Sequence, residues 1–280
     1  MPLLDVRDLQ KWYGRRHVVD GVSFDVEQGE VVGLLGPNGA GKTTSFRITI
    51  GLIRADGGRV IFNGQEVNQL AMYQRARTGM GYLAQDPSVF RQLSVEKNLL
   101  AILETLPIGR KERYRRCEDL LRQFGLTHIR ATKAQRVSGG ERRRLEIARC
   151  LVTQPKLIML DEPFAGIDPK TVLEIQQSIR DLAEQYRIGI LLTDHNVRET
   201  LEVTDRAYII HQGRVFAKGD RIAILRNAEV RKHYLGERFD AGHLLDQPTP
   251  HATPSTALEP PRMVVDPLFP YHGEEDESDA

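Results

Sequence analysis

The sequence predicts an α/β fold with a parallel sheet at its centre and an all-helical insertion. Four continuous apolar runs have the length of a strand and are typical of strands covered on both faces: 31–36, 157–160, 189–193 and 207–211. Helical patterns begin near Pro169 and His195, and strands that alternate with helices pair in parallel. Residues 87–155 have helical patterns throughout, which predicts an insertion between two strands of the sheet.

Shorter patterns predict the remaining elements. Alternating Val22, Phe24 and Val26 indicate a half-buried strand, and helix-forming residues start at Lys42 after a glycine-rich turn. The insertion should hold three helices, over about 94–105, 111–124 and 140–153. A hairpin-like turn is expected at Gln212-Gly213, and two short helices should follow it.

The composition divides the chain of 280 residues into a mildly basic body and an acidic tail. The formal net charge of +1 excludes a uniformly basic nucleic-acid coat protein. Residues 241–280 hold eight acidic residues, one basic residue and seven of the fourteen prolines, which leaves residues 1–240 with a net charge of +8. Such a segment cannot bury enough apolar surface to offset its ordering entropy. We therefore expect residues 241–280 to be a disordered tail.

The cysteines and the apolar runs indicate a cytoplasmic protein. Cys117 and Cys150 are too few for a disulfide framework or a four-cysteine metal site and fit a reducing cytosol. No apolar run approaches the 18 or more residues of a membrane-spanning helix. Asp5 and Asp8 interrupt the region where a signal peptide would be apolar. Contact with a membrane would therefore come only through partners.

A phosphate-binding loop is predicted directly after the strand at 31–36. The sequence GPNGAGKT fits G-x-x-x-x-G-K-[ST] between a predicted strand and a predicted helix, which is the context the motif requires. Backbone N–H groups and the helix N-terminus would surround the phosphates, Lys42 would reach the β- and γ-phosphates, and Thr43 would ligate Mg²⁺. The alternative is a glycine-rich turn with an accidental lysine. The expected nucleotide-binding residues are Gly36, Pro37, Asn38, Gly39, Ala40, Gly41, Lys42, Thr43 and Thr44.

Two carboxylates end the predicted strand at 157–160. Asp161 would hold the Mg²⁺ shell, and Glu162 would polarise the attacking water. The alternative is an Asp-Glu pair that only caps a strand-to-helix loop. The phosphate loop, which precedes the pair in the chain, favours the catalytic interpretation.

A second glycine-rich segment opens the last predicted helix of the insertion. Ser138 and Glu141 form a capping box, but capping does not require Gly139 and Gly140. Two bare amides beside a serine hydroxyl at a positive helix end make another phosphate-binding surface. One chain cannot easily offer both surfaces to one γ-phosphate. The motif therefore predicts a nucleotide held between two copies, as in a homodimer.

The order of the motifs resembles the ATP-binding cassette (ABC) ATPase family. The resemblance covers about residues 3–238 and rests on GPNGAGKT, Gln85, VSGGE, LIMLDEP, Asp168 and His195. It implies a P-loop NTPase (RecA-like) core with an N-terminal antiparallel β subdomain, an inserted helical subdomain and a separate tail. The implied ranges are 1–86 and 156–240 for the core with its β subdomain, 87–155 for the helical subdomain and 241–280 for the tail. Val137 stands where the family usually has leucine, which leaves the serine and the glycines intact.

The resemblance implies further roles for single residues. Gln85 would sense Mg²⁺ where the core joins the insertion, Asp168 would bridge two subunits, and His195 would contact the γ-phosphate. Tyr13 would stack on adenine. Each has a simpler alternative. Gln85 could be an ordinary loop amide, Asp168 is also a good helix N-cap, and His195 could lie at the surface. The adjacent Trp12 could stack on adenine in place of Tyr13.

Several stretches resemble one branch of the family more closely. DEPFAGIDP, TDHNVRETL, SGGERRRLEIAR and HYLGERF are similar to the cytoplasmic ATPase of lipopolysaccharide exporters of Gram-negative bacteria. This implies two copies beneath a pair of transmembrane permease subunits, each of which inserts a coupling helix into a groove of the ATPase. Phe90 would pack against that helix, with Arg91 at the rim of the groove. Alternatively, Phe90 is an ordinary core residue and Arg91 is solvated.

Two other functions remain open on the sequence alone. An importer ATPase of the branched-chain amino-acid type would share every catalytic residue, and a soluble ABC ATPase of iron–sulfur assembly has the same architecture. Nucleic-acid binding is not expected. The run Arg142-Arg143-Arg144 indicates a solvated helix face instead, or one that partly faces the nucleotide.

Overall fold

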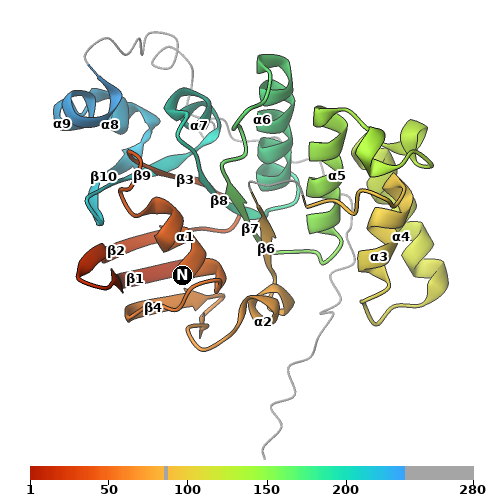
Figure 1. Ribbon diagram of the computed structural model, residues 1–280, viewed down its shortest axis with the longest axis horizontal. Helices are drawn as coiled ribbons and strands as arrows, with labels where there is room; N and C mark the ends of the chain where they lie inside the picture. The colour runs from red at the N-terminus through yellow and green to blue at the C-terminus, as the bar shows by residue number, and fades with distance from the viewer. Residues whose placement is uncertain (85–87, 237–280) are drawn as a thin grey trace, which may run out of the picture.

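A computed structural model describes residues 1–84 and 88–236, which form two sheets with helices around them (Figure 1). The first sheet is antiparallel and has the strand order β2-β1-β4-β5. Its strands are β1 (Leu4–Tyr13), β2 (Arg16–Val26), β4 (Gly57–Phe62) and β5 (Gln65–Glu66). Val22, Phe24 and Val26 are buried, as their alternation predicts. The predicted N-terminal antiparallel subdomain is thus present.

The second sheet has six strands in the order β10-β9-β3-β8-β7-β6. Five of them pair in parallel, and β10 returns antiparallel to β9 through the predicted turn at Gln212-Gly213. The strands are β3 (Val31–Leu35), β6 (Met80–Leu83), β7 (Leu157–Asp161), β8 (Gly189–Thr193), β9 (Arg206–His211) and β10 (Arg214–Asp220). Every residue of β3, β7 and β8 is buried, which explains their continuous apolar sequences.

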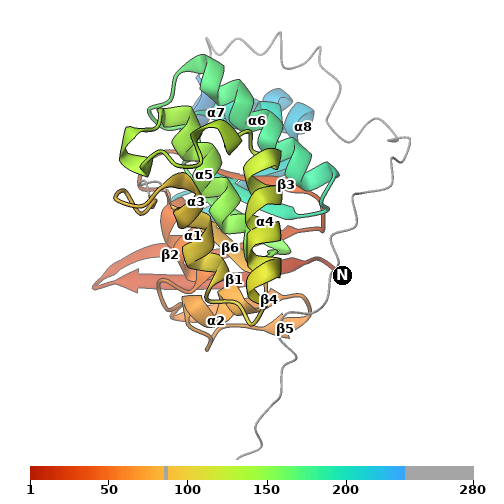
Figure 2. The same cartoon turned by 90° about the vertical axis from the view of Figure 1, so that its right-hand side faces the viewer.

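The central strands divide their side chains between two cores. Val31, Ile158 and Ile190 join a core that also contains helical residues of the insertion and of α6 (Pro169–Glu184). Their chain neighbours Val32, Met159 and Leu191 join the core beneath the antiparallel sheet. Figures 1 and 2 accordingly show α6 (Pro169–Glu184) and α7 (Val197–Val203) across the six-stranded sheet from β1 and β4.

The insertion is helical, as predicted. Its main helices lie together at one end of the molecule, which faces the viewer in Figure 2: α3 (Val95–Leu103), α4 (Arg110–Gln123) and α5 (Gly139–Leu151). The other helices are α1 (Lys42–Ile50), α2 (Met72–Arg77), α8 (Arg221–Arg226) and α9 (Ala228–Val230), with single turns η1 (Thr127–Ile129), η2 (Ala134–Arg136) and η3 (Arg231–Leu235). No helix in the described ranges is long and apolar enough to cross a membrane.

One sequence interpretation is wrong in part. The arginine run on α5 was expected to be solvated, but Arg143 is 7 % exposed and pairs with the buried Glu146. Arg143 and Glu146 are three positions apart on the helix, so they share the face that packs inward. Residue 85 and the tail at 241–280 lie outside the described residues, so their predictions stay untested.

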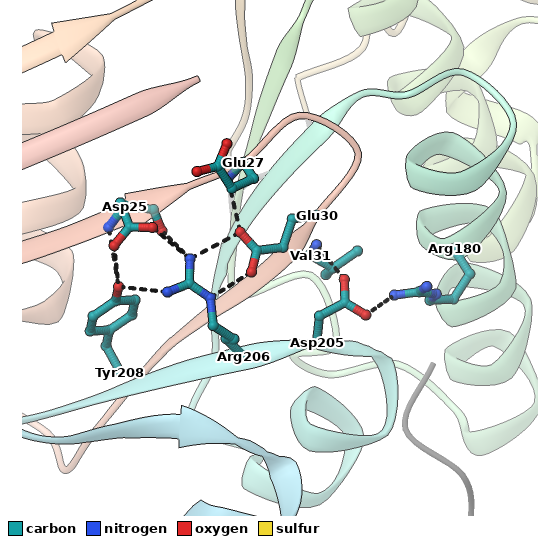
Figure 3. Close-up of polar contacts among 8 residues, drawn as sticks. All are labelled: Asp25, Glu27, Glu30, Val31, Arg180, Asp205, Arg206 and Tyr208. Atoms are coloured by element: carbon teal, nitrogen blue, oxygen red, sulfur yellow. Dashed lines mark hydrogen bonds and ion pairs between the residues drawn. The ribbon is translucent and has the colours of Figure 1, made fainter. Parts of the chain in front are cut away.

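Arg206 at the start of β9 ties the two sheets together (Figure 3). Its guanidinium donates to the carboxylates of Asp25 and Glu30 at 2.6 and 2.5 Å, and Tyr208 donates to Asp25 at 2.7 Å. Burial alone would raise the pKa of Asp25, but the bonds from Arg206 and Tyr208 outweigh burial and lower it. Next to this cluster, Asp205 accepts from Val31 N–H and from the Arg180 guanidinium.

We expect Arg206→Met to lower the free energy of unfolding by about 1–2 kcal/mol, because it leaves two partly buried carboxylates without their cation. The lowered pKa of Asp25 stabilises the fold above its unfolded pKa of about 3.9, and that contribution is lost as the pH falls through the folded value. The variant should therefore lose less stability than the wild type on acidification. Urea unfolding at several pH values measures this. Arg214→Met, which breaks the more exposed pair with Asp20, is the control and should have little effect.

Candidate active site

The predicted phosphate-binding loop connects β3 to α1, and its carbonyl groups surround its own lysine. Lys42 Nζ donates to the carbonyl oxygens of Gly36 at 2.6 Å and Pro37 at 3.0 Å. Gly36 and Gly41 have φ values of +147° and +106°. A Cβ would lie 2.1 Å from the Ile210 carbonyl oxygen at Gly36, and 2.6 Å from that of Val18 at Gly41. The tight turn therefore requires glycine at both positions.

Lys42 is buried, and two acidic side chains influence its charge. Burial lowers the pKa of Lys42, and the negative charges of Glu162 and Asp194 oppose that shift. Two carboxylates from neighbouring strand ends thus act electrostatically on the ammonium group. Backbone amides at the start of α1 add the positive end of a helix to the same place. An anionic phosphate would fit among these positive groups.

The two carboxylates predicted to act on Mg²⁺ and on the attacking water lie at the end of β7. Asp161 ends that strand with a buried carboxylate that accepts from Thr193 Oγ1 at 3.2 Å, and burial raises its pKa. Glu162 has a φ of +45°, a left-handed conformation that is uncommon outside glycine, and its N–H donates to the Thr193 carbonyl at 2.8 Å. A local conformation of this kind occurs preferentially at functional sites.

His195 lies beside Glu162. Its Nδ1 atom is 3.5 Å from Glu162 Oε2 and 3.4 Å from Asp194 Oδ1. The side chain is 57 % exposed, so it can meet a ligand that enters from solvent. The ends of the adjacent strands β7 and β8 therefore bring Glu162 and His195 together.

Asp194 is a site residue that the sequence interpretation missed. Its side chain is fully buried, accepts from the backbone N–H of Phe164 at 3.0 Å, and accepts from the N–H of Asn196 at 2.8 Å. It thereby fastens the segment after Glu162 to the segment around His195. The signal was available, because a carboxylate directly after a continuous apolar strand is placed where burial is expected.

A pocket of about 310 Å³ adjoins the phosphate loop. It is lined by Pro37–Ala40, by Arg16–Val18 of β2 and by residues 211–213. Trp12, the alternative to Tyr13 for stacking on adenine, stacks on His17 with the ring centroids 4.0 Å apart. Tyr13 is 50 % exposed, and Lys11 Nζ lies 5.7 Å from its ring centroid. Neither Trp12 nor Tyr13 lines the pocket itself.

The second glycine-rich segment makes the predicted capping box. The Ser138 N–H donates to Glu141 Oε2 at 2.8 Å, and the Glu141 N–H donates to Ser138 Oγ at 3.3 Å. A Cβ on Gly139 would meet nothing within 4 Å, so this segment presents an open surface. Within the described residues, no hydrogen bond joins Ser138–Glu141 to the phosphate loop of the same chain.

Asp168 is the N-cap of α6, as its simpler interpretation predicts. Its Oδ1 accepts from the Thr171 N–H at 3.1 Å, and hydrogen bonds from Thr171 lower the pKa of the carboxyl. The side chain remains exposed, so a contact with another subunit is compatible with capping.

Phe90 is not a core residue, contrary to its simpler interpretation. Its side chain is 44 % exposed, and the Arg149 guanidinium lies 4.5 Å from its ring centroid. Arg91 is exposed as well. The two residues together present an aromatic and a cationic group on the insertion.

The residues at the site fit Mg²⁺. The ion prefers oxygen ligands, keeps several waters and is usually bound through one or two protein groups together with substrate phosphates. The Thr43 hydroxyl follows Lys42 directly, and Asp161 supplies a buried carboxylate at the end of β7. Gln85, the third predicted ligand, lies outside the described residues.

Comparison with known proteins agrees with this geometry. The ABC transporter family model matches residues 19–165. The chain is 54 % identical to the lipopolysaccharide export system ATP-binding protein LptB of Acidithiobacillus ferridurans, over 85 % of this chain and 98 % of that protein. It is 47 % identical to LptB of Escherichia coli K12, over 85 % of this chain and 99 % of that protein.

A solved structure shares the fold. The crystal structure of the ADP conformation of MJ1267, an ATP-binding cassette of an ABC transporter, matches with a TM-score of 0.75 and 29 % identity, over 85 % of this chain and all of that chain. The phosphate loop, the carboxylate pair and the capping segment thus occur in the fold and order of that family. The chain belongs to the ABC transporter family as one of its ATP-binding, ATP-hydrolysing subunits.

Proposed function

We propose that the chain powers the extraction of lipopolysaccharide from the inner membrane and its export to the outer membrane. It would act as a homodimer beneath two transmembrane subunits of the LptF/LptG type, on the cytoplasmic side of the inner membrane. The relatives named LptB support the substrate, and the match covers 85 % of this chain and 98–99 % of theirs. The placement of Glu162 beside His195 and near Lys42 supports the chemistry.

In this mechanism the phosphate loop binds ATP, with Lys42 moving from its carbonyl partners to the β- and γ-phosphates. Glu162 is the general base that takes a proton from the attacking water, and His195 holds the γ-phosphate in line with it. Asp194 holds the segment after Glu162 and the segment around His195 in place relative to each other. When bound by Thr43 and Asp161, with Gln85, Mg²⁺ would neutralise charge on the phosphate oxygens.

The second copy completes the site. Ser138, Gly139, Gly140 and Glu141 of one chain would face the ATP held by the other, and Asp168 would bridge the two chains. ATP therefore stabilises the closed dimer, and hydrolysis removes the contacts that close it. The difference in affinity of ATP and ADP for the closed state is what can do work on a partner.

The partner-facing surface is the insertion. We assign the ATPase core with its β subdomain to residues 1–86 and 156–240 and the helical subdomain to 87–155. Phe90 presents an exposed ring there, with Arg91 next to it, and these two side chains would receive the coupling helix. An exposed aromatic residue of this kind is typical of an interface anchor.

Purification of tagged chain from native membranes tests the proposal. The wild type should retain a pair of polytopic subunits, and Phe90→Ala should lose them. The control is Tyr73→Ala on α2, which removes another exposed aromatic ring and should keep the subunits. Retention of amino-acid permeases would contradict the proposed substrate, and recovery of soluble partners alone would contradict a transport function.

A further inference from the structure

Helix α5 holds both polar groups of the Ser88 backbone. The Ser88 N–H donates to Glu146 Oε1 at 2.9 Å, and its carbonyl accepts from Arg149 Nη1 at 2.5 Å. The two side chains are three positions apart and therefore project from one face of the helix. Ser88 cannot shift relative to α5 without the loss of two hydrogen bonds to charged groups, which are stronger than neutral ones.

The next residues of this loop are fastened as well. Asn98 of α3 is fully buried, accepts from the Phe90 N–H at 2.8 Å and donates to the Phe90 carbonyl at 3.1 Å. The Arg149 guanidinium that binds Ser88 also lies against the Phe90 ring. The Phe90 backbone is thus held by α3 and its ring contacts α5, so a force on the ring acts on α5.

Besides the Ser88 N–H, Glu146 has a charged partner, the buried side chain of Arg143. Its Oε2 atom lies 3.2 Å from Arg143 Nη1, and the two side chains are 4 % and 8 % exposed. A buried ion pair contributes little net stability, because desolvation offsets the attraction. Glu146 instead uses its two carboxylate oxygens for two partners, Oε2 for Arg143 of the same helix and Oε1 for the Ser88 amide of the loop.

We propose that Glu146 and Arg149 are positioning residues that clamp the partner-facing loop to α5, so that movement of Phe90 is passed to the segment Ser138–Glu141. The inference rests on the proposed function. α5 begins directly after Ser138, and a regular helix rises about 1.5 Å per residue, so the clamp lies roughly 10–15 Å from that segment on one rigid element.

The test uses the full chain alone and in complex with the transmembrane subunits that it retains. The measured quantity is the ratio of ATP turnover in the complex to that of the isolated chain. Arg149→Met and Glu146→Gln should each lower this ratio about tenfold, because each weakens a charged hydrogen bond to Ser88. Arg149→Lys should restore part of it, since lysine can still donate to the carbonyl. Glu174→Gln, which breaks the exposed pair between Arg144 of the same helix and α6, should leave it unchanged.

Amide hydrogen exchange at Ser88 in the isolated chain checks the clamp without any partner, and it should accelerate in Glu146→Gln. If that variant unfolds, Arg149→Met decides the outcome, because it leaves the Arg143–Glu146 pair intact. If Arg149→Met still binds the membrane subunits and keeps the wild-type ratio of turnover in the complex to turnover of the isolated chain, the clamp is wrong and the proposed function stands. A wild-type chain that these subunits neither bind nor stimulate overturns the proposed function and the clamp together.

Discussion

Glu162→Gln should lower ATP turnover by about 10²–10⁴, the usual contribution of a positioned general base. Glutamine keeps the shape of the side chain and leaves the backbone bond to the Thr193 carbonyl in place. It cannot accept the proton of the attacking water. Binding of ATP should persist, because Lys42 and the glycines of the loop are untouched.

Phosphate release under saturating ATP measures the turnover, and a fluorescent ATP analogue measures binding. Glu174→Gln makes the same chemical change at an exposed ion pair and should retain wild-type turnover. Near-wild-type turnover in Glu162→Gln would show that another group activates the water. Equal loss of binding and turnover would show that Glu162 acts mainly through the loop that holds ATP.

Ser138→Ala should lower turnover by about 10²–10³, the cost of removing one donor that stabilises transition-state charge. The affinity of the isolated chain for ATP should not change, since no described hydrogen bond joins this serine to its own phosphate loop. The change also removes a helix cap, which costs about 1 kcal/mol. Ser94→Ala is the matched control, because Ser94 caps α3 in the same insertion and should affect turnover little.

Mixing two inactive variants separates a shared site from a site within one chain. A dimer of one Ser138→Ala chain and one Lys42→Ala chain would contain one intact site, made of an unaltered loop and an unaltered serine. Turnover should therefore reappear on mixing. A mixture as inactive as its components would contradict the two-copy site.

Much of the fold and of the site was predictable because it depends on local patterns. The buried strands are continuous apolar runs, and the phosphate loop needs glycine where a Cβ would collide with Ile210 and Val18. The carboxylates at 161 and 162 stand at a strand end, where parallel sheets gather functional groups. These signals are contained in short stretches of sequence and do not depend on distant contacts.

Other features depend on contacts between distant segments. Arg143 has arginine neighbours and resembles a solvated residue, but its environment is set by Glu146 and the packing of α5. Phe90 contacts Arg149, 59 positions later in the chain, and its backbone N–H donates to Asn98. The apolar strand before Asp194 indicates that this residue is buried, but its contact with Phe164 depends on the pairing of β7 with β8. No local pattern encodes these distances.

Movement of lipopolysaccharide by the reconstituted complex tests the central claim most directly. The chain and its transmembrane subunits are placed in vesicles loaded with lipopolysaccharide, and transfer to an external acceptor is followed with and without ATP. ATP should drive transfer by the wild type, and Glu162→Gln should abolish it while the complex stays assembled. Turnover of ATP by the wild-type complex without any transfer would contradict the claim and assign the ATPase to another substrate.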